Sequence, residues 1–165
     1  MSKILVLCRH GKAENPSNSD DFVRPLKEKG KIVTEIMGEL LSHMDIQTDI
    51  IISSPAKRAI STAEILAKQL NFTNQIQLEQ DIYEQDLEKE IELIRNINND
   101  NISAIVVGHN PTMEKLARTF LSMEGLIEMP TCGIVAIEFS SDDWKSIQEH
   151  LATLKWFLSP KMVLR

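Results

Sequence analysis

Short apolar runs and longer amphipathic stretches alternate along this chain of 165 residues. Runs rich in Ile, Val and Leu predict strands at about residues 4–8, 49–53, 76–78, 102–107, 133–139 and 152–158. Apolar side chains at helical spacing predict helices at about residues 28–44, 55–70, 87–97, 111–122 and 144–151. Because strands that alternate with helices are typical of α/β folds, we expect a three-layer sandwich. Helices would flank a mostly parallel central sheet, with the last strand at an edge.

Length and composition fit a single domain over residues 1–165. A chain of this size buries about two-thirds of its unfolded surface. No apolar run approaches the roughly 20 residues that a membrane span needs. The first residues carry one Lys and a short apolar stretch, without the longer apolar core of a signal peptide. We therefore expect a cytoplasmic protein without a membrane partner, and nothing in the sequence demands more than a monomer.

Charge and cysteine content argue against further classes of protein. The formal net charge of −6 disfavours a general nucleic-acid binder, whose affinity comes largely from Lys and Arg. Cys8 and Cys132 are too few for a disulfide framework, and no Cys/His pair has the spacing of a zinc site. The net charge still allows a small cationic pocket within an acidic surface.

Histidine and arginine follow three of the predicted strands, near the point where each strand ends. The first strand runs into Arg9 and His10, the second is followed by Arg58, and the strand at 102–107 is followed by His109. Ligands of open α/β sheets bind beyond the carboxyl ends of the strands. We therefore expect these four side chains to lie together at one end of the sheet.

Two of the predicted helices begin with residues that favour helix N-termini. Ser54 and Asn110 would be the N-caps, and Pro55 and Pro111 would occupy the first helical positions. Both N-termini would direct partial positive charge and free N–H groups toward the same region. Such a pocket suits an oxyanion, and phosphate fits best.

Each of these residues, taken singly, has an ordinary structural interpretation. A histidine at a strand end usually makes a structural hydrogen bond, a single arginine is usually part of a surface ion pair, and Gly11 could be a turn residue. The coincidence of three strand ends at one edge favours a site instead. His43 and His150 lie in helical stretches without a partner motif, and we assign them no function.

Several blocks of sequence occur together in a fixed order. Arg9-His10-Gly11 precedes Ser-Pro-x-x-Arg-Ala-x-x-Thr-Ala at 54–63 and Gly-His-Asn-Pro at 108–111. These blocks resemble the histidine phosphatase (phosphoglycerate mutase-like) superfamily, and the chain is most similar to its short SixA-type phosphohistidine phosphatases. Those proteins also have an Arg-Pro-Leu block followed by Gly, as in residues 24–30, and a segment before a late strand like residues 129–133. The resemblance runs from residue 3 to about 160 and implies the phosphoglycerate mutase-like fold.

The resemblance also implies roles for the residues at the strand ends. His10 would attack phosphorus and become a phosphohistidine, while Arg9 and Arg58 would bind phosphoryl oxygens and balance charge in the transition state. Arg24 would be a further substrate-binding residue on the loop that covers the site. His109, protonated when phosphate is bound, would donate to another oxygen. Water would then hydrolyse the phosphoenzyme without a metal ion or other cofactor, because cationic side chains take the place of Mg²⁺.

The proton donor to the leaving group stays open. Larger members of the superfamily use a carboxyl group after the third strand, and Glu84 falls in roughly that place. SixA-type proteins often lack a clear acid, and a solvated carboxylate in an acidic stretch is an equally good interpretation of Glu84. A weak acid would suit the labile P–N bond of phosphohistidine and would suit an alkyl phosphate poorly.

Short connections between the predicted elements leave little chain to cover the pocket, which favours a phosphorylated side chain on a protein as the substrate. We expect a phosphohistidine phosphatase of signal transduction. The alternatives are a phosphatase of small phosphomonoesters and a non-catalytic phosphate- or protein-binding module on the same fold. Intact His10 argues against the non-catalytic module. Glu14 and Glu138 stand where a cysteine phosphatase would need arginine, and the chain has no P-loop.

Overall fold

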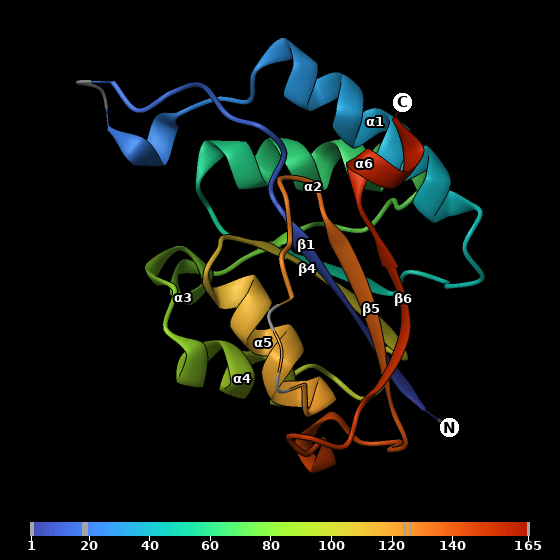
Figure 1. Cartoon of the computed structure of the whole chain (residues 1–165). Helices are drawn as coiled ribbons and strands as arrows, with labels where there is room; N and C mark the ends of the chain where they lie inside the picture. The colour runs from blue at the N-terminus through green and yellow to red at the C-terminus, as the bar shows by residue number, and fades with distance from the viewer. Residues whose placement is uncertain (1, 18–19, 124, 126, 165) are drawn as a thin grey trace.

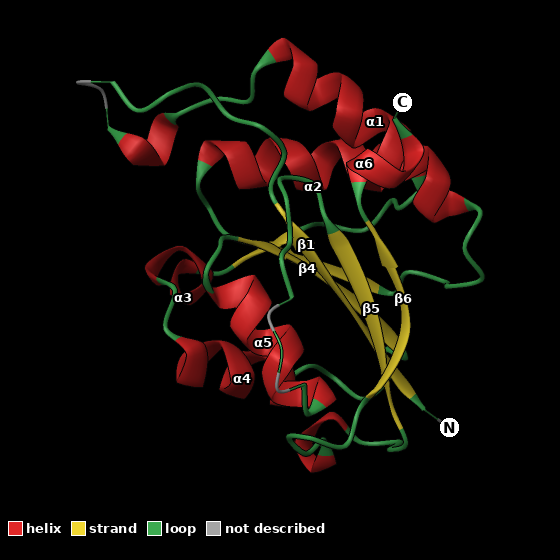
Figure 2. Ribbon diagram, in the orientation of Figure 1, coloured by secondary structure: helices red, strands yellow, loops and turns green. Residues whose placement is uncertain are grey.

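A six-stranded sheet forms the middle of the molecule (Figures 1 and 2). The computed structural model describes the chain except residues 1, 18–19, 124, 126 and 165. These residues belong to the expected domain over 1–165 but lie outside the described part of the chain. The strands lie in the order β3-β2-β4-β1-β5-β6. Their bounds are β1 Lys3–Arg9, β2 Ile50–Ser53, β3 Gln77–Leu78, β4 Ser103–Gly108, β5 Ile134–Phe139 and β6 Thr153–Leu158. Each strand predicted from the sequence is present, and β6 lies at an edge as expected.

The sheet is mostly parallel. β1 pairs with β4, β4 with β2, and β2 with β3, all in parallel register. β5 runs antiparallel to both β1 and β6, so it alone among these six strands has the opposite direction. Every residue of β4 is buried, because β4 lies in the middle of the sheet and both of its faces are covered.

Helices cover both faces of the sheet and complete the expected three layers. α1 (Glu28–Ser42) and α2 (Lys57–Gln69) lie on one face, and α3 (Gln80–Glu84), α4 (Leu87–Arg95) and α5 (Thr112–Leu121) lie on the other (Figure 2). Alternate residues of β1 point to the two cores: Leu5 and Leu7 pack toward α5, whereas Val6 and Cys8 pack toward α1 and α2. A short α6 (Pro160–Val163) closes the chain. No helix in the described part of the chain is long and apolar enough to cross a membrane.

Two predicted helix starts were wrong, because the expected capping side chains are engaged elsewhere. α2 begins at Lys57 with Ala56 as N-cap, and α5 begins at Thr112 with Pro111 as N-cap. The Ser54 hydroxyl contacts His109 Nε2 at 2.7 Å, and the Asn110 amide donates to Glu114 and to the Met129 carbonyl. The proline at 55 therefore lies before α2 rather than in its first turn.

The predicted helix at 144–151 is only a 3₁₀ turn over Trp144–Ser146. Trp144 is buried, its indole N–H donates to the Asn101 carbonyl, and its backbone N–H donates to Asn99. Ile147 is extended and buried, which ends the turn. A second 3₁₀ turn, Asp21–Val23, was not predicted and lies on the loop before Arg24.

The start of α1 lies directly against the segment that follows His10. A Cβ atom on Gly30 would stand 2.1 Å from the Lys12 carbonyl oxygen, so only glycine allows this approach. The same carbonyl accepts a hydrogen bond from the Lys27 backbone N–H at 2.9 Å. The block from Arg24 to Gly30 is therefore attached to the segment that follows His10.

We predict that Gly30→Ala lowers the free energy of unfolding by about 1–3 kcal/mol, because the added methyl group forces two backbone segments apart. Gly38→Ala is the matched control on the same helix. Its Cβ would stand 2.9 Å from Gln69 Cγ, a side-chain contact rather than a backbone one, and the gain of about 1 kcal/mol in helix propensity would offset part of the crowding, so we expect a smaller loss. Urea denaturation measures both. Equal losses would show that the approach to Lys12 is not a constraint on stability.

Candidate active site

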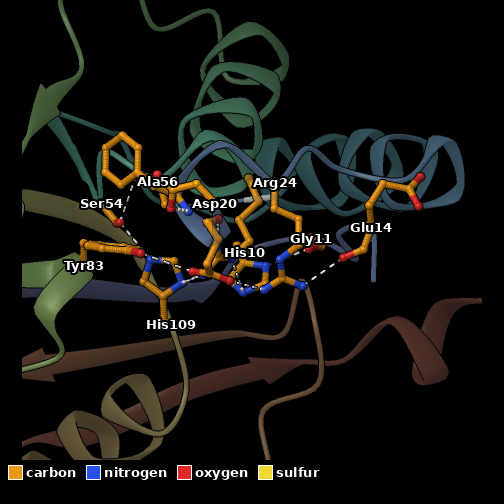
Figure 3. A network of polar contacts seen from close by, with 12 residues as sticks. His10, Gly11, Glu14, Asp20, Arg24, Ser54, Ala56, Tyr83 and His109 are labelled. Carbon is orange, nitrogen blue, oxygen red and sulfur yellow. Dashed lines mark hydrogen bonds and ion pairs between the residues drawn. The ribbon is translucent and has the colours of Figure 1, made fainter. Parts of the chain in front are cut away.

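His10 lies immediately beyond the carboxyl end of β1, and its backbone N–H donates to the carbonyl of Gly108 at 3.0 Å on the neighbouring β4. The residue is 8% exposed. Nδ1 lies 2.7 Å from the Gly11 carbonyl oxygen, which can only accept, so Nδ1 carries the proton (Figure 3). Nε2 is then unprotonated and accepts a hydrogen bond from Arg58 Nε at 3.3 Å.

His109 lies beyond the end of β4 and is 3% exposed. Its ring centroid is 5.1 Å from that of His10. Nδ1 is 3.3 Å from Arg58 Nη2, which can only donate, so Nδ1 is the acceptor. A neutral ring then has its proton on Nε2, which donates to the Ser54 hydroxyl at 2.7 Å (Figure 3). The two imidazoles thus present unprotonated nitrogens to the same guanidinium group.

Burial and positive charge keep both rings neutral. Burial lowers the pKa of His10 to about 4, and the charges of Arg58, Arg9 and Arg24 add to this effect, while the bond to Gly11 opposes it. Burial, His10 and Arg58 lower the pKa of His109 to about 3. An anion bound between the rings would oppose these effects, because it favours the protonated form.

Arg58 lies in the first turn of α2 and is 5% exposed. Thr62, one turn later, donates to the Arg58 carbonyl at 2.7 Å and accepts from the Gly11 N–H at 2.9 Å. This hydroxyl therefore connects α2 to the segment after His10. Thr62 belongs to the sequence block at 54–63, although it was not singled out from the sequence.

Asp21 is part of the site and was not predicted from the sequence. Its carboxylate accepts from Arg24 Nη2 at 2.8 Å and from Arg58 Nη2 at 3.0 Å, and the Tyr83 hydroxyl donates to it at 3.3 Å. Partial burial would raise the pKa of Asp21, but the two guanidinium groups outweigh it and the pKa lies below its usual value. The spacing of Asp21 three residues before Arg24 was the available signal, because it suits a contact within one turn.

Arg24 and Arg9, the other predicted arginines, donate to Asp21 and to backbone carbonyl groups. Arg24 reaches the site through Asp21, and its Nη1 donates to the Glu14 carbonyl. Arg9 donates from Nη1 to the Met129 carbonyl at 3.0 Å, and its Nε is buried with no partner among the described residues. The charge of Arg9 helps to lower the pKa of His10, although its Nη1 donates to the loop before β5.

Glu84 forms an ion pair with Lys89. Its carboxylate lies 3.6 Å from Lys89 Nζ and is about half exposed. Its neighbour Tyr83 instead faces the site, with its ring 5.9 Å from that of His109 and 5.1 Å from that of Phe22. Within the described residues, no group of three or more His, Cys, Asp or Glu side chains is arranged to hold a metal ion.

The geometry suits the binding of a tetrahedral oxyanion. A buried guanidinium group lies between two unprotonated imidazole nitrogens, and the Arg24 guanidinium is linked to it through Asp21. Charge-assisted N–H donors in a buried site bind phosphoryl oxygens strongly. An unprotonated imidazole nitrogen next to a bound phosphoryl group can act as a nucleophile.

Comparisons with known sequences agree with this chemistry. The model of the histidine phosphatase superfamily (branch 1) matches residues 5–92, more than half of the chain. Curated relatives include the mitochondrial serine/threonine-protein phosphatase Pgam5 of Drosophila yakuba, 35% identical over 68 residues, and that of Drosophila melanogaster, 34% identical over the same length. These matches cover 41% of the chain and span only 23% of the length of each relative.

Solved structures share the fold over nearly the whole chain. The protein histidine phosphatase SixA complexed with tungstate superposes with a TM-score of 0.85 at 23% identity, covering 97% of this chain and 99% of that one. A SixA protein of Agrobacterium tumefaciens gives 0.80 at 26% identity, with 96% and 98% covered. A mycobacterial glucosyl-3-phosphoglycerate phosphatase gives 0.68 at 15% identity, with 94% and 98% covered. The expected phosphoglycerate mutase-like fold is confirmed.

We predict that NMR titration of the ring nitrogens gives a midpoint near pH 4 for His10 and near pH 3 for His109 in the phosphate-free protein. Inorganic phosphate should raise both. These values lie below the usual 6.5, so the unfolded chain binds more protons in this range. The contribution of these two histidines to stability is therefore fully present above pH 6.5 and is lost as the pH falls toward 3. Midpoints near 6.5 without phosphate would contradict the desolvated, cation-lined site.

Proposed function

The chain belongs to the histidine phosphatase superfamily, and we propose that it removes phosphoryl groups from phosphohistidine residues of proteins through a phosphohistidine intermediate on His10. The observation that carries the proposal is the state of His10. Its Nδ1 proton is held by the Gly11 carbonyl, and its unprotonated Nε2 faces Arg58 in a buried pocket. This is the state that an imidazole nucleophile requires before attack.

In the proposed first step, a bond forms between His10 Nε2 and phosphorus while the bond from phosphorus to the substrate nitrogen breaks. The leaving imidazole takes a proton from solvent. Arg58, Arg9 and Arg24 stabilise the negative charge of the phosphoryl oxygens, and His109 donates to one oxygen once the anion has raised its pKa. Water then attacks phosphorus, the Nε2–phosphorus bond breaks, and phosphate leaves as His10 returns to its starting form.

Two observations support a phosphohistidine protein as substrate. The SixA protein of Agrobacterium tumefaciens, at 26% identity, superposes over 96% of this chain, which adds little beyond that common fold. The Glu84 carboxylate is paired with Lys89, which argues against this carboxyl group as the acid for an alkoxide leaving group. A phosphoramidate bond needs less help, because its nitrogen leaves readily once protonated. The proposal includes action as a monomer in cytoplasmic signal transduction.

A phosphatase of small phosphomonoesters is the second candidate. The mycobacterial glucosyl-3-phosphoglycerate phosphatase has the same fold, although its 15% identity carries no argument about substrate. A non-catalytic binding module is the third, and the intact nucleophile position at His10 argues against it. Substrate comparison separates the three.

The substrate panel uses a phosphohistidine protein and an alkyl phosphate, with wild type and Glu84→Gln measured on both. We expect a higher kcat/KM for the phosphohistidine protein and a mild effect of Glu84→Gln on it. If Glu84 turned inward to act as the acid, Glu84→Gln would lower kcat/KM for the alkyl phosphate by about 10²–10⁴-fold. A large and equal loss on both substrates would establish Glu84 as a true acid and contradict the phosphohistidine assignment.

Arg58→Ala should reduce kcat/KM by at least ~100-fold, because a charge-assisted contact to the transition state is worth about 3 kcal/mol. Lys57→Ala is the matched control, since Lys57 is the exposed neighbour on the same turn of α2. Steady-state kinetics on the preferred substrate, with thermal melts to confirm folding, measure both. Equal effects of the two substitutions would show that Arg58 has no specific role in the reaction.

A further inference from the structure

The Arg58 guanidinium has two hydrogen-bonding edges that face different partners. Nε and one N–H of Nη2 form the inner edge, which faces His10 Nε2 and His109 Nδ1, each at 3.3 Å. Nη1 and the other N–H of Nη2 form the outer edge. They donate to the Asp21 carbonyl at 2.8 Å and to the Asp21 carboxylate at 3.0 Å. One residue therefore holds the whole outer edge.

The Asp21 carboxylate accepts hydrogen bonds from two other residues besides Arg58. Its second carboxylate oxygen accepts from Arg24 Nη2 at 2.8 Å, and the Tyr83 hydroxyl donates to the oxygen that binds Arg58. Burial and the Asp21 carboxylate raise the pKa of Tyr83, so this phenol keeps the proton that it donates. The ring of Phe22 packs edge-on against Tyr83 at 5.1 Å, which attaches the 3₁₀ turn to α3.

We propose that Asp21 is a positioning residue for the phosphatase reaction, holding the outer edge of Arg58 so that the inner edge faces the phosphoryl group between His10 and His109. The inference rests on the proposed function and extends it to Asp21, a residue to which the sequence alone assigned no role. A planar guanidinium binds two oxygens well only when its orientation is set beforehand. Asp21 sets that orientation from the edge that the phosphoryl group does not use.

The opposite role, in which Asp21 competes with phosphate, fits the contacts less well. A competing carboxylate would occupy the inner edge, whereas Asp21 occupies the outer edge and leaves Nε toward His10. The two roles predict opposite changes in phosphate affinity. Removal of a competitor strengthens binding of inorganic phosphate, and removal of a positioning residue weakens it.

The test compares Asp21→Asn with Asp20→Asn, its neighbour on the same turn. The Asp20 carboxylate accepts from the Phe22 N–H and caps the turn, a role that asparagine also performs. Both variants lose one negative charge, but only Asp21→Asn loses the ionic contact with Arg58. We expect at least about a tenfold loss of kcat/KM and a weaker inhibition constant for inorganic phosphate in Asp21→Asn, with Asp20→Asn close to wild type.

Tyr83→Phe provides a second variant that leaves Asp21 in place. It removes the phenol donor and keeps the ring, so we expect a smaller loss in the same direction and no further loss when it is added to Asp21→Asn. Unchanged kinetics in Asp21→Asn, or tighter binding of inorganic phosphate, would overturn the proposal. Calorimetry of inorganic phosphate binding tests the role of Asp21 in the absence of any substrate turnover. Wild type that binds phosphate but hydrolyses no substrate would refute the proposed function alone.

Discussion

The buried guanidinium of Arg58 is the constraint on which the rest of the site depends. A charged group with almost no exposure to solvent must have its N–H donors satisfied, and leaving them unpaired would cost several kcal/mol. Here two histidines and Asp21 accept from four of its five N–H groups. The ends of β1 and β4, the first turn of α2 and the loop before Arg24 are therefore brought together around one side chain.

The same arrangement determines the protonation states. Because Arg58 can only donate, the histidine nitrogens that face it must accept, and burial disfavours the charged imidazolium forms. The backbone completes the pattern, since the Gly11 carbonyl keeps the His10 proton on Nδ1. A cationic site that holds neutral imidazoles attracts an oxyanion and provides an unprotonated nitrogen beside it. In the proposed mechanism, the ends of two adjacent strands provide both the phosphate-binding groups and the nucleophile.

The sequence predicted the parts that depend on local pattern. Periodicity located the strands, and the position of His10, His109 and Arg58 near strand ends predicted that they would meet, as the structure shows. Asp21 could not be found in this way. It lies on a loop without periodicity, and its partner Arg58 is 37 residues away in the sequence. Ser54 and Asn110 were expected to cap helices, but Ala56 and Pro111 are the N-caps, and the two side chains also contact His109 and the Met129 carbonyl, which the sequence pattern does not indicate. Glu84 and Tyr83 are adjacent in the sequence, and it is Tyr83 whose ring lies next to His109, while Glu84 contacts Lys89. This choice depends on the orientation of α3, which the sequence pattern does not give.

The central claim is that His10 Nε2 is the nucleophile. The most direct measurement is to mix the protein with a radiolabelled phosphohistidine protein, quench in base, digest, and locate the label by mass spectrometry. The account predicts a base-stable, acid-labile adduct on the peptide that contains His10, with phosphorus on Nε2 rather than Nδ1. His10→Ala should form no adduct and show no turnover. Label on another residue, or substantial turnover by His10→Ala, would contradict the account.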